Sequence, residues 1–255
     1  MKAVVDVQLL KKFINQFPLI YDIALYFQDD KIFIQEQDSG HCAMIMSSMK
    51  VLMSDNFCTK FKIADANDCL KVKGDIVIEL KDKKLLIDNK TIKCELITDE
   101  RKTPKNFEFD NMVSIDRKLL SSLKPIGNYI HITMNRNGLR IYSKDEEKSE
   151  EIYIPKGSFR SMKCAGESRS LYGNNLLVPL IKNLPGDIIQ LEFKSGSDEA
   201  EKCAPMSIKY RDENIETNIF IAPRFCDEEH NDIKDIPPID EKKFQSQTFD
   251  DDELF

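Results

Sequence analysis

Hydrophobic and polar residues follow two different spacings along this chain, the helical spacing and the alternation of a β-strand. Four times, a segment with helical spacing is followed by a segment with strand alternation. Near the N-terminus, a segment with helical spacing carries the apolar residues Leu9, Leu10, Phe13, Ile14 and Phe17. An alternating strand pattern follows over 23–27. The pattern therefore predicts an amphipathic helix over 8–17 that leads through a turn into a β-strand.

The same order of a helix, a turn and a strand recurs three more times. Helices are predicted at 66–72, 116–123 and 175–184, and an apolar strand pattern follows each of them. In all three units the turn holds a glycine followed by Asp or Asn, at Gly74, Gly127 and Gly186. This pairing is typical of chain reversals that need a left-handed residue.

Further alternating runs with tight turns follow the four strands. The pair Asn137-Gly138, between two such runs, is typical of a β-hairpin. A charged, proline-containing stretch at 98–106 is typical of a linker. The sequence thus predicts an α+β fold of two similar domains, each with two helix-plus-β-meander units. The predicted parts are 1–97, a connector at 98–106, 107–225, and a tail at 226–255.

The formal charge of the chain is unevenly distributed. The 255 residues include 44 Asp and Glu against 37 Lys and Arg, a net charge of −7. Residues 226–255 alone hold 11 acidic residues against 3 lysines, a net of −8, which leaves +1 for residues 1–225. The acidity therefore belongs to the tail, and the near-neutral body is compatible with a nucleic-acid partner.

No pattern of residues predicts an active site. Seven cysteines lie far apart without a Cys-x-x-Cys pair, and the adjacent His41 and Cys42 would point to opposite faces of a strand. Phosphate-binding glycine loops and zinc-protease motifs do not occur in the sequence. We therefore expect no enzyme activity, no catalytic residue, no metal and no cofactor. The alternative is an enzyme that holds a metal through Asp38 and His41.

The hydrophobic runs also bear on location. None approaches the roughly 18–20 residues of a membrane-spanning helix, and the first residues lack a signal-peptide pattern. We expect an intracellular protein with free thiols and no membrane partner. Its place would be the nucleus in a eukaryote, and otherwise the cytoplasm or a viral replication site.

Three stretches occur in the order and spacing of one known family. Residues 9–13 read Leu-Leu-Lys-Lys-Phe, and 34–44 hold an Asp-Ser-x-His core between two strand patterns. Residues 205–210 and 219–225 form two late strand patterns, the second of which contains Ala-Pro. Together with the fourfold repeat, they resemble the proliferating cell nuclear antigen (PCNA) family of eukaryotic and archaeal DNA sliding clamps over about residues 1–225.

This resemblance implies a ring with helices around a central hole and sheets on the outside. Double-stranded DNA passes through the hole without being read in sequence, and the ring tethers DNA polymerase as a processivity factor in replication and repair. The implied partners are this DNA, DNA polymerase, the clamp loader and other clamp-binding proteins, and the implied assembly is a homotrimer. Subunit contacts are expected through two antiparallel edge strands, one around 71–80 with its neighbours and one around 169–177.

The DNA-facing residues implied by the resemblance are basic residues on or beside the four helices. Lys11 and Lys12 lie opposite the apolar stripe of the first helix. The second helix is the weakest candidate because two aspartates dilute its charge. Arg136 and Arg140, on the predicted hairpin, are assigned to the outer wall. The full inner set is Lys11, Lys12, Lys71, Lys73, Arg117, Lys118, Lys124 and Lys182.

A partner-binding groove is also implied, beside the terminal strand and under the connector. It accepts a short segment with a glutamine and a pair of aromatic residues. The positions carried over are His41, Met44, Ile97, Pro205, Phe220, Ala222 and Pro223. The connector at 98–106 departs from the family because it is charged where relatives are apolar, so partner specificity stays open, and Phe107 is a further apolar candidate beside Ile97.

The tail at 226–255 extends beyond the usual end of the family. Its acidic residues and Pro237-Pro238 are typical of a disordered segment. The alternative is that the aromatic segment 244–249 and the final Leu254-Phe255 dock in the groove of the same chain, in a neighbour's groove or on a partner.

A second function stays open within the same architecture. The chain is then a diverged clamp-like subunit of a checkpoint complex or of a viral transcription or replication complex, and is hetero-oligomeric or monomeric.

Overall fold

The computed structural model describes residues 1–88, 90–99, 101, 107–121, 124, 126–195, 205–224 and 236–246. The predicted connector and the predicted tail therefore lie partly outside the described residues. The chain forms two compact units. Unit 1 comprises Met1–Lys105, Asn183–Gly186 and Lys209–Ile219, and unit 2 comprises Asn106–Lys182, Asp187–Ile208 and Phe220–Phe255. The segment 209–219 thus packs with unit 1, although it follows most of unit 2 in the sequence.

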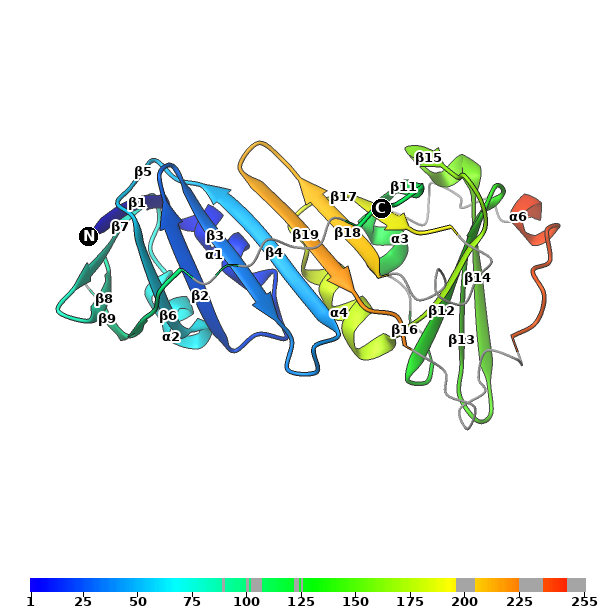
Figure 1. Cartoon of the computed structure of the whole chain (residues 1–255), viewed down its shortest axis with the longest axis horizontal. Coiled ribbons are helices and arrows are strands. Elements are labelled where there is room, and N and C mark those ends of the chain that lie inside the picture. The colour runs from blue at the N-terminus through cyan, green and yellow to red at the C-terminus, as the bar shows by residue number, and fades with distance from the viewer. Residues whose placement is uncertain are drawn as a thin grey trace. The chain divides into compact units, whose positions relative to one another are not determined.

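Unit 1 contains two helices and two antiparallel sheets (Figure 1). Its elements are β1 (Lys2–Asp6), α1 (Val7–Asn15), β2 (Asp22–Gln28), β3 (Lys31–Gln37), β4 (Ala43–Lys50), β5 (Met53–Ser54), β6 (Phe57–Lys62), α2 (Ile63–Cys69), β7 (Asp75–Lys81), β8 (Lys84–Ile87), β9 (Lys90–Lys93) and β10 (Glu95–Leu96). One sheet has the order β5-β1-β7-β8-β9. In the other, β10-β6-β2-β3-β4 is continued by β19 (Ile215–Ile221), whose first five residues belong to this unit.

Unit 2 repeats this plan. Its elements are β11 (Asn111–Asp116), α3 (Arg117–Ser121), β12 (Tyr129–Asn135), β13 (Gly138–Lys144), β14 (Ser149–Pro155), the 3₁₀ turn η1 (Lys156–Ser158), β15 (Ser161–Lys163), β16 (Ser168–Gly173), α4 (Asn174–Asn183), β17 (Ile188–Phe193), β18 (Met206–Arg211) and α6 (Lys243–Ser246). One sheet has the order β14-β13-β12-β16, and the other contains β18-β17-β11-β15. The structure thus confirms an α+β fold with two similar halves.

The amphipathic pattern explains how the helices pack on the sheets. On α1 the buried residues are Val7, Leu10, Phe13 and Ile14, at the helical spacing seen in the sequence. In unit 2, Leu120 of α3 and Leu177 of α4 meet Ile132 of β12 and Leu139 of β13 around a small internal cavity. Each pair of helices therefore covers the apolar side of the strands of its own unit.

Two of the three predicted glycine turns have the expected conformation. Gly74 and Gly127 have φ values of +87° and +70°, which only glycine adopts without strain. Gly186 does not have a positive φ, and a Cβ added there would lie 1.8 Å from the ring of Tyr210. At Gly186 the sequence therefore needs glycine for close packing, not for a left-handed turn.

Strand β7, in the expected contact region around 71–80, is not itself an edge strand because it lies inside its sheet, and contact through its neighbours stays a prediction. It pairs with β1 on one side and with β8 on the other. The edge strands of that sheet are β5 and β9, and those of the four-stranded sheet of unit 2 are β14 and β16. Subunit contact through 169–177, which includes most of β16, stays a prediction.

Within the described residues, no helix combines the length and apolar character that a membrane crossing requires.

Candidate functional site

Helix α1 presents the first two predicted DNA-facing lysines. Asp6 caps its N-terminus by accepting a hydrogen bond from the Leu9 amide at 2.7 Å. Lys11 and Lys12 are exposed on the side opposite the buried stripe, and neither makes an ion pair with a residue that the structure describes. Both lysines are thus exposed, and the charge of Lys12 contributes to the lowered pKa of Asp212.

A buried polar network fixes the C-terminal end of α1. The Gln16 amide donates to Ser47 Oγ at 2.9 Å and accepts from Thr217 Oγ1 at 2.8 Å, and the two hydroxyls lie 2.7 Å apart. All three side chains are buried. Because the partners of Gln16 lie on β4 and β19, the network holds the lysine-bearing helix on its sheet.

Helix α2 differs from α1 in its N-terminal cap and in the charge around its lysines, and the sequence already indicates the difference in charge. It has no side-chain N-cap, and Asp65 lies in its first turn. Lys71 and Lys73 are exposed just beyond the helix, but Lys71 Nζ forms a 2.9 Å ion pair with Asp68. The hydrogen bond from Lys71 lowers the pKa of Asp68, so this partner carboxylate stays ionised. Lys71 is therefore at least partly neutralised.

The basic residues of unit 2 lie on or beside α3 and α4. Arg117, half-buried at the start of α3, donates from Nη1 to the Lys182 carbonyl at 2.8 Å and so connects α3 to α4. Lys118, Lys124 and Lys182 are exposed. In unit 1 the corresponding connection is a reciprocal amide pair between Asn15 and Asn67, at 3.0 and 3.1 Å. In each unit the basic residues thus lie on or beside two joined helices.

Three of the predicted groove residues lie in unit 1. His41 is exposed and has a φ of +54° in the turn before β4. The Asp38 carboxylate shapes this turn by accepting hydrogen bonds from the amides of Gly40, Cys42 and Ala43. Met44 and Ile97 are half-buried. The Asp-Ser-x-His core is therefore a turn whose aspartate is used to hold the backbone.

The other four groove residues lie in unit 2. Pro205 and Phe220 are half-buried, Ala222 is exposed and Pro223 is buried. The Phe220 ring lies 5.5 Å from that of Phe107 and 6.5 Å from that of Phe109, measured between centroids. Phe107 is 38 % exposed. These rings form a partly exposed aromatic cluster, and Phe109 is the member that sequence reasoning missed. The assembly of all seven positions into one groove stays a prediction.

The described part of the connector lies against unit 1. The Arg101 guanidinium lies 4.5 Å from the Phe33 ring centroid and 5.1 Å from that of Tyr26. It also pairs with Asp99 at 2.6 Å. A hollow of about 680 Å³ next to it is lined by Met46, Ser48 and Glu216, among others. Sequence reasoning identified the charge of the connector but not this cation–π contact, which depends on residues about 70 positions earlier.

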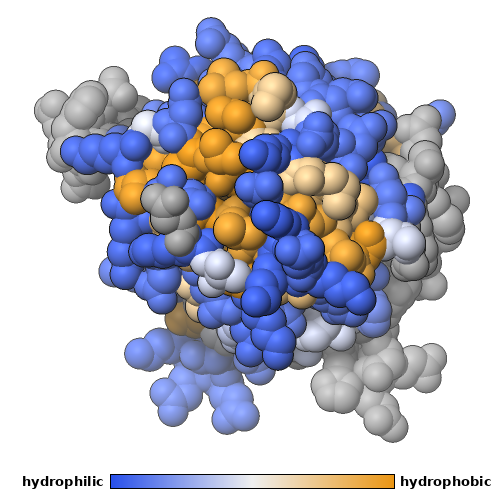
Figure 2. Space-filling view, turned by 90° about the vertical axis from the view of Figure 1, so that its left-hand side faces the viewer, coloured by the Kyte–Doolittle hydropathy of each residue, from blue (hydrophilic) through white to orange (hydrophobic). Residues whose placement is uncertain are grey.

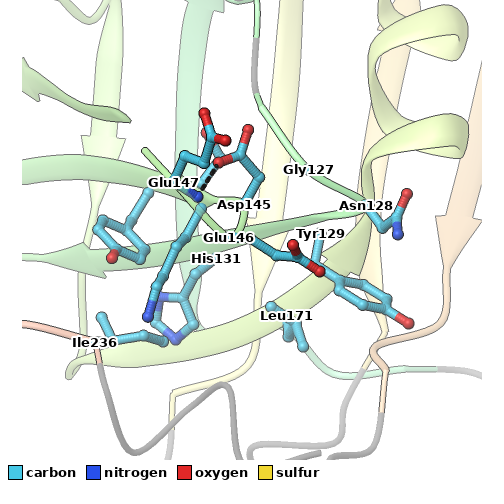
Figure 3. A pocket seen from close by; sticks show the side chains of 12 residues that line it. Gly127, Asn128, Tyr129, His131, Asp145, Glu146, Glu147, Leu171 and Ile236 are labelled. Carbon is cyan, nitrogen blue, oxygen red and sulfur yellow. Dashed lines mark hydrogen bonds between the residues drawn. The ribbon is translucent and has the colours of Figure 1, made fainter. Parts of the chain in front are cut away.

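A second hollow, of about 780 Å³, opens on the sheet of unit 2 (Figure 3). Tyr129, His131 and Leu171 line it, together with Ile236. Burial, with the charges of Arg169 and Arg140, lowers the pKa of His131 to about 3, so the imidazole is neutral. Asp145, on the rim, accepts hydrogen bonds from the amides of Glu147 and Lys148 and thereby forms a turn.

Unit 1 also carries an exposed apolar patch, on the sheet that contains β1, β5 and β7. Val4 faces both Met53 and Val77 in the register of the strands, and the latter two are 57 % and 42 % exposed. Leu52, next to Met53, is 67 % exposed. Figure 2 views this side of unit 1 and shows apolar residues bordered by hydrophilic ones.

Among the residues that the structure describes, no three or more His, Cys, Asp or Glu side chains are grouped to hold a metal ion. Asp38 and His41, the alternative metal pair, lie in a turn where the aspartate accepts backbone amides.

Comparison with known proteins identifies the fold. No protein-family model and no curated protein sequence matches the chain. A crystal structure of the PCNA2–PCNA3 complex from Sulfolobus tokodaii is similar with a TM-score of 0.71 and 21 % identity, over 88 % of this chain and 99 % of that one. The A. fulgidus PCNA bound to the C-terminal region of FEN-1 is similar with a TM-score of 0.70 and 15 % identity, over 89 % and 99 %. The chain therefore has the fold of the PCNA sliding clamps.

Proposed function

We propose that this chain is a subunit of a ring-shaped sliding clamp that encircles duplex DNA and tethers a DNA polymerase and other replication and repair proteins. The proposal is supported chiefly by exposed lysines that recur on α1, α3 and α4, in a chain with the fold of PCNA clamps. Lysines that contact phosphates without reading bases allow a ring to slide.

The ring would assemble as a homotrimer by pairing edge strands. Among the described residues, no further strand pairs with the outer edges of β5 and β9 in unit 1 or of β14 and β16 in unit 2, although the Leu171 carbonyl of β16 accepts a hydrogen bond from the Arg224 amide at 2.8 Å. Pairing such edges between copies satisfies their free N–H and C=O groups and closes the assembly. The role in synthesis is tethering, with no catalytic residue, metal or cofactor, and the place of action is the nucleus or another site of DNA replication.

The partner-binding surface is proposed to include the aromatic cluster of Phe107, Phe109 and Phe220. Partly exposed aromatic rings bordered by polar residues are typical of sites that hold a short peptide. One structure similar to this chain, the A. fulgidus PCNA, has the C-terminal region of FEN-1 bound. By analogy, clamp-binding proteins would dock a short aromatic-bearing segment here.

The test is processive synthesis on a primed circular template with the polymerase and clamp loader of the same source. The test variant replaces Lys11, Lys12, Lys118 and Lys182 with Ala. A matched control replaces four exposed lysines on strands and turns, Lys81, Lys84, Lys144 and Lys148. We expect roughly tenfold fewer long products from the test variant only, because it loses the phosphate contacts. If both variants support synthesis equally, the four lysines do not make the phosphate contacts that the proposal assigns to them.

A second candidate is a clamp built from different chains, in which this protein is one subunit of a checkpoint or viral complex. One of the similar structures is a complex of two different clamp chains, PCNA2 and PCNA3. Native mass spectrometry of the purified chain separates the two candidates. A trimer of identical chains supports the homotrimeric clamp, and a monomer supports the mixed ring.

A further inference from the structure

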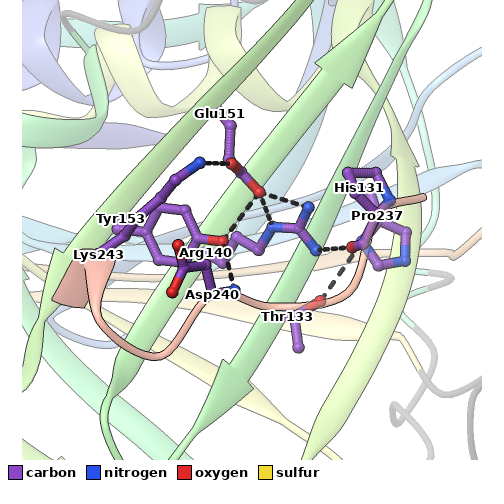
Figure 4. A network of polar contacts seen from close by, with 8 residues as sticks. All are labelled: His131, Thr133, Arg140, Glu151, Tyr153, Pro237, Asp240 and Lys243. Carbon is purple, nitrogen blue, oxygen red and sulfur yellow. Dashed lines mark hydrogen bonds and ion pairs between the residues drawn. The ribbon is translucent and has the colours of Figure 1, made fainter.

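The segment 236–246, here called the strap, packs in unit 2 on the face of β13 and β14 that carries Arg140 and Tyr153, here called the outer face. Figure 4 shows it crossing the strands over Glu151, Arg140 and Tyr153. Phe244, in α6, is 5 % exposed, and its ring meets that of Tyr153 edge-on with centroids 4.8 Å apart. The part of the predicted tail that is described is therefore docked on the body of the same chain.

The receiving surface is held in shape by groups of the sheet itself. Arg140 is 1 % exposed, its guanidinium pairs with Glu151 at 2.5 Å, and it lies over the rings of Tyr142 and Tyr153. Burial raises the pKa of Glu151, but a hydrogen bond from Lys243 of the strap, one from Tyr153 of the sheet and the charge of Arg140 outweigh it, so the net shift is downward. The arginine is thus oriented for a ligand by residues of β13 and β14.

Two of the strap contacts go to its main chain. Arg140 Nη1 donates to the Pro237 carbonyl at 2.9 Å, and the Asp240 amide donates to Tyr153 Oη at 3.1 Å. Contacts of this kind recognise a peptide backbone, whatever the side chains are. Another peptide whose backbone follows a similar path can therefore accept the hydrogen bond from Arg140 and donate one to Tyr153 Oη.

The remaining contacts select an acidic group, a basic group and an aromatic ring. The Glu241 carboxylate accepts hydrogen bonds from Asn135, at 3.1 Å, and from Asn137. Lys243 Nζ pairs with Glu151 at 2.6 Å. The Phe244 ring lies over Gly138, where an added Cβ would be only 2.9 Å from the ring. The same added Cβ would lie 2.1 Å from the Ile154 carbonyl oxygen, so the pairing of β13 with β14 already requires glycine here, and the Phe244 ring packs against the space this glycine leaves.

We propose that the outer face of β13 and β14 is a peptide-binding site, and that the strap occupies it until a partner displaces it. The partner is a protein segment of the same chemistry: a backbone outside helix and strand, then a carboxylate, a basic residue two positions later and an aromatic residue three positions later. Tethering gives the strap an effective concentration of about millimolar, so only a partner that binds tightly or is abundant replaces it. This site does not depend on ring formation or on DNA.

The test uses a fluorescent synthetic peptide with the sequence of 236–246, titrated into the full-length chain without DNA. Wild type is compared with Phe244→Ala, which weakens its own strap. We expect the variant to bind the peptide at least about tenfold more tightly than wild type does, because its site is open. A peptide that carries Ala in place of its Phe should fail to bind.

A matched pair of variants distinguishes the loss of a strap contact from an effect on folding. Lys243→Ala removes a strap contact, whereas Lys242→Ala removes the neighbouring, exposed lysine, for whose side chain no contact with the described residues is seen. Both variants lose the same charge on the surface, and we expect only Lys243→Ala to increase peptide binding. Equal affinity for wild type, Phe244→Ala and Lys243→Ala, or no binding to any of them, would overturn the proposal. A wild-type dimer that Phe244→Ala converts to monomer would place the strap on a second copy and overturn it too.

Discussion

Helices α1 and α2 occupy corresponding places in the two repeats of unit 1 but are stabilised differently. Helix α1 has an aspartate cap at its start and the Gln16 network at its end, and its two lysines make no ion pair among the described residues. Helix α2 has no side-chain cap, and Lys71 beyond its end is paired with Asp68. The difference shows that a repeat in the sequence does not imply equal contributions from its copies. Of these two helices, the one with the side-chain cap and the buried polar network also carries the exposed lysines that form no ion pair with a described residue.

The largest expected effect concerns the core under the two helices. Phe13 is fully buried under α1, so Phe13→Ala should lower the free energy of unfolding by about 3–5 kcal/mol. Ala66 is the buried residue in the middle of α2, and Ala66→Gly should cost only about 1 kcal/mol. Urea unfolding of both variants measures the difference. A loss of only about 1 kcal/mol from Phe13→Ala would contradict the packing of this ring in the core under α1.

The second largest expected effect is on the affinity for DNA. Replacing Lys11 and Lys12 with Ala should weaken binding to duplex DNA roughly tenfold. The slope of log K against log salt concentration should also become shallower, by the amount expected for the loss of about two phosphate contacts. The same change at Lys71 and Lys73 should have a clearly smaller effect, because Lys71 is already paired. Binding measured between low and moderate salt tests this prediction. A stronger effect from the α2 pair would reverse the comparison.

A smaller effect is expected from the N-terminal cap. Asp6→Ala removes the acceptor for the Leu9 amide and should cost about 1 kcal/mol of stability. Asp65→Ala, in the first turn of α2, removes only a favourable interaction with the helix dipole and should cost about 0.3 kcal/mol. Thermal unfolding of the two variants in parallel is the measurement, and a larger loss at Asp65 would contradict the assignment of the cap.

The smallest effect should come from freeing Lys71. Asp68→Asn removes the partner of Lys71, and we expect a gain in DNA affinity of no more than about twofold, since exposed pairs are weak. Acidification is not a substitute for this variant. The hydrogen bond from Lys71 lowers the pKa of Asp68, so the carboxylate loses its charge only at a lower pH than an ordinary aspartate does. A decrease in affinity would show that the pair positions Lys71 for DNA.

Local patterns predicted what depends on nearby residues. Each of the four predicted helices corresponds to one of the helices α1–α4, because apolar residues at helical spacing must face a core wherever the helix lies. Helix α2 begins three residues earlier than predicted, since Ile63 continues directly from β6. The place of β7 inside its sheet was not predictable, for the opposite reason. Whether β7 is inside a sheet depends on β1, which is about 70 residues away in the sequence.

Polar contacts between residues that lie far apart in the sequence were likewise not predictable from local patterns. Gln16 meets Thr217 across 201 positions, and no local pattern indicates that pair. Arg140 was assigned to the outer wall, and it is buried because residues almost 100 positions later cover it. For the tail, the sequence identified Phe244 as an aromatic able to dock. The surface that receives it combines Gly138 and Tyr153, which become neighbours only through the pairing of β13 with β14.

Encirclement of DNA is the central claim, and retention on DNA with open or blocked ends tests it most directly. The protein is added to a linear duplex attached to a bead at one end, the free end is then blocked, and the beads are washed in high salt. We predict that the protein is retained on DNA with both ends blocked, because salt weakens phosphate contacts but does not open a ring. Cutting the DNA beside the block should release it. Retention that is the same before and after cutting, or loss in high salt from doubly blocked DNA, would contradict the account.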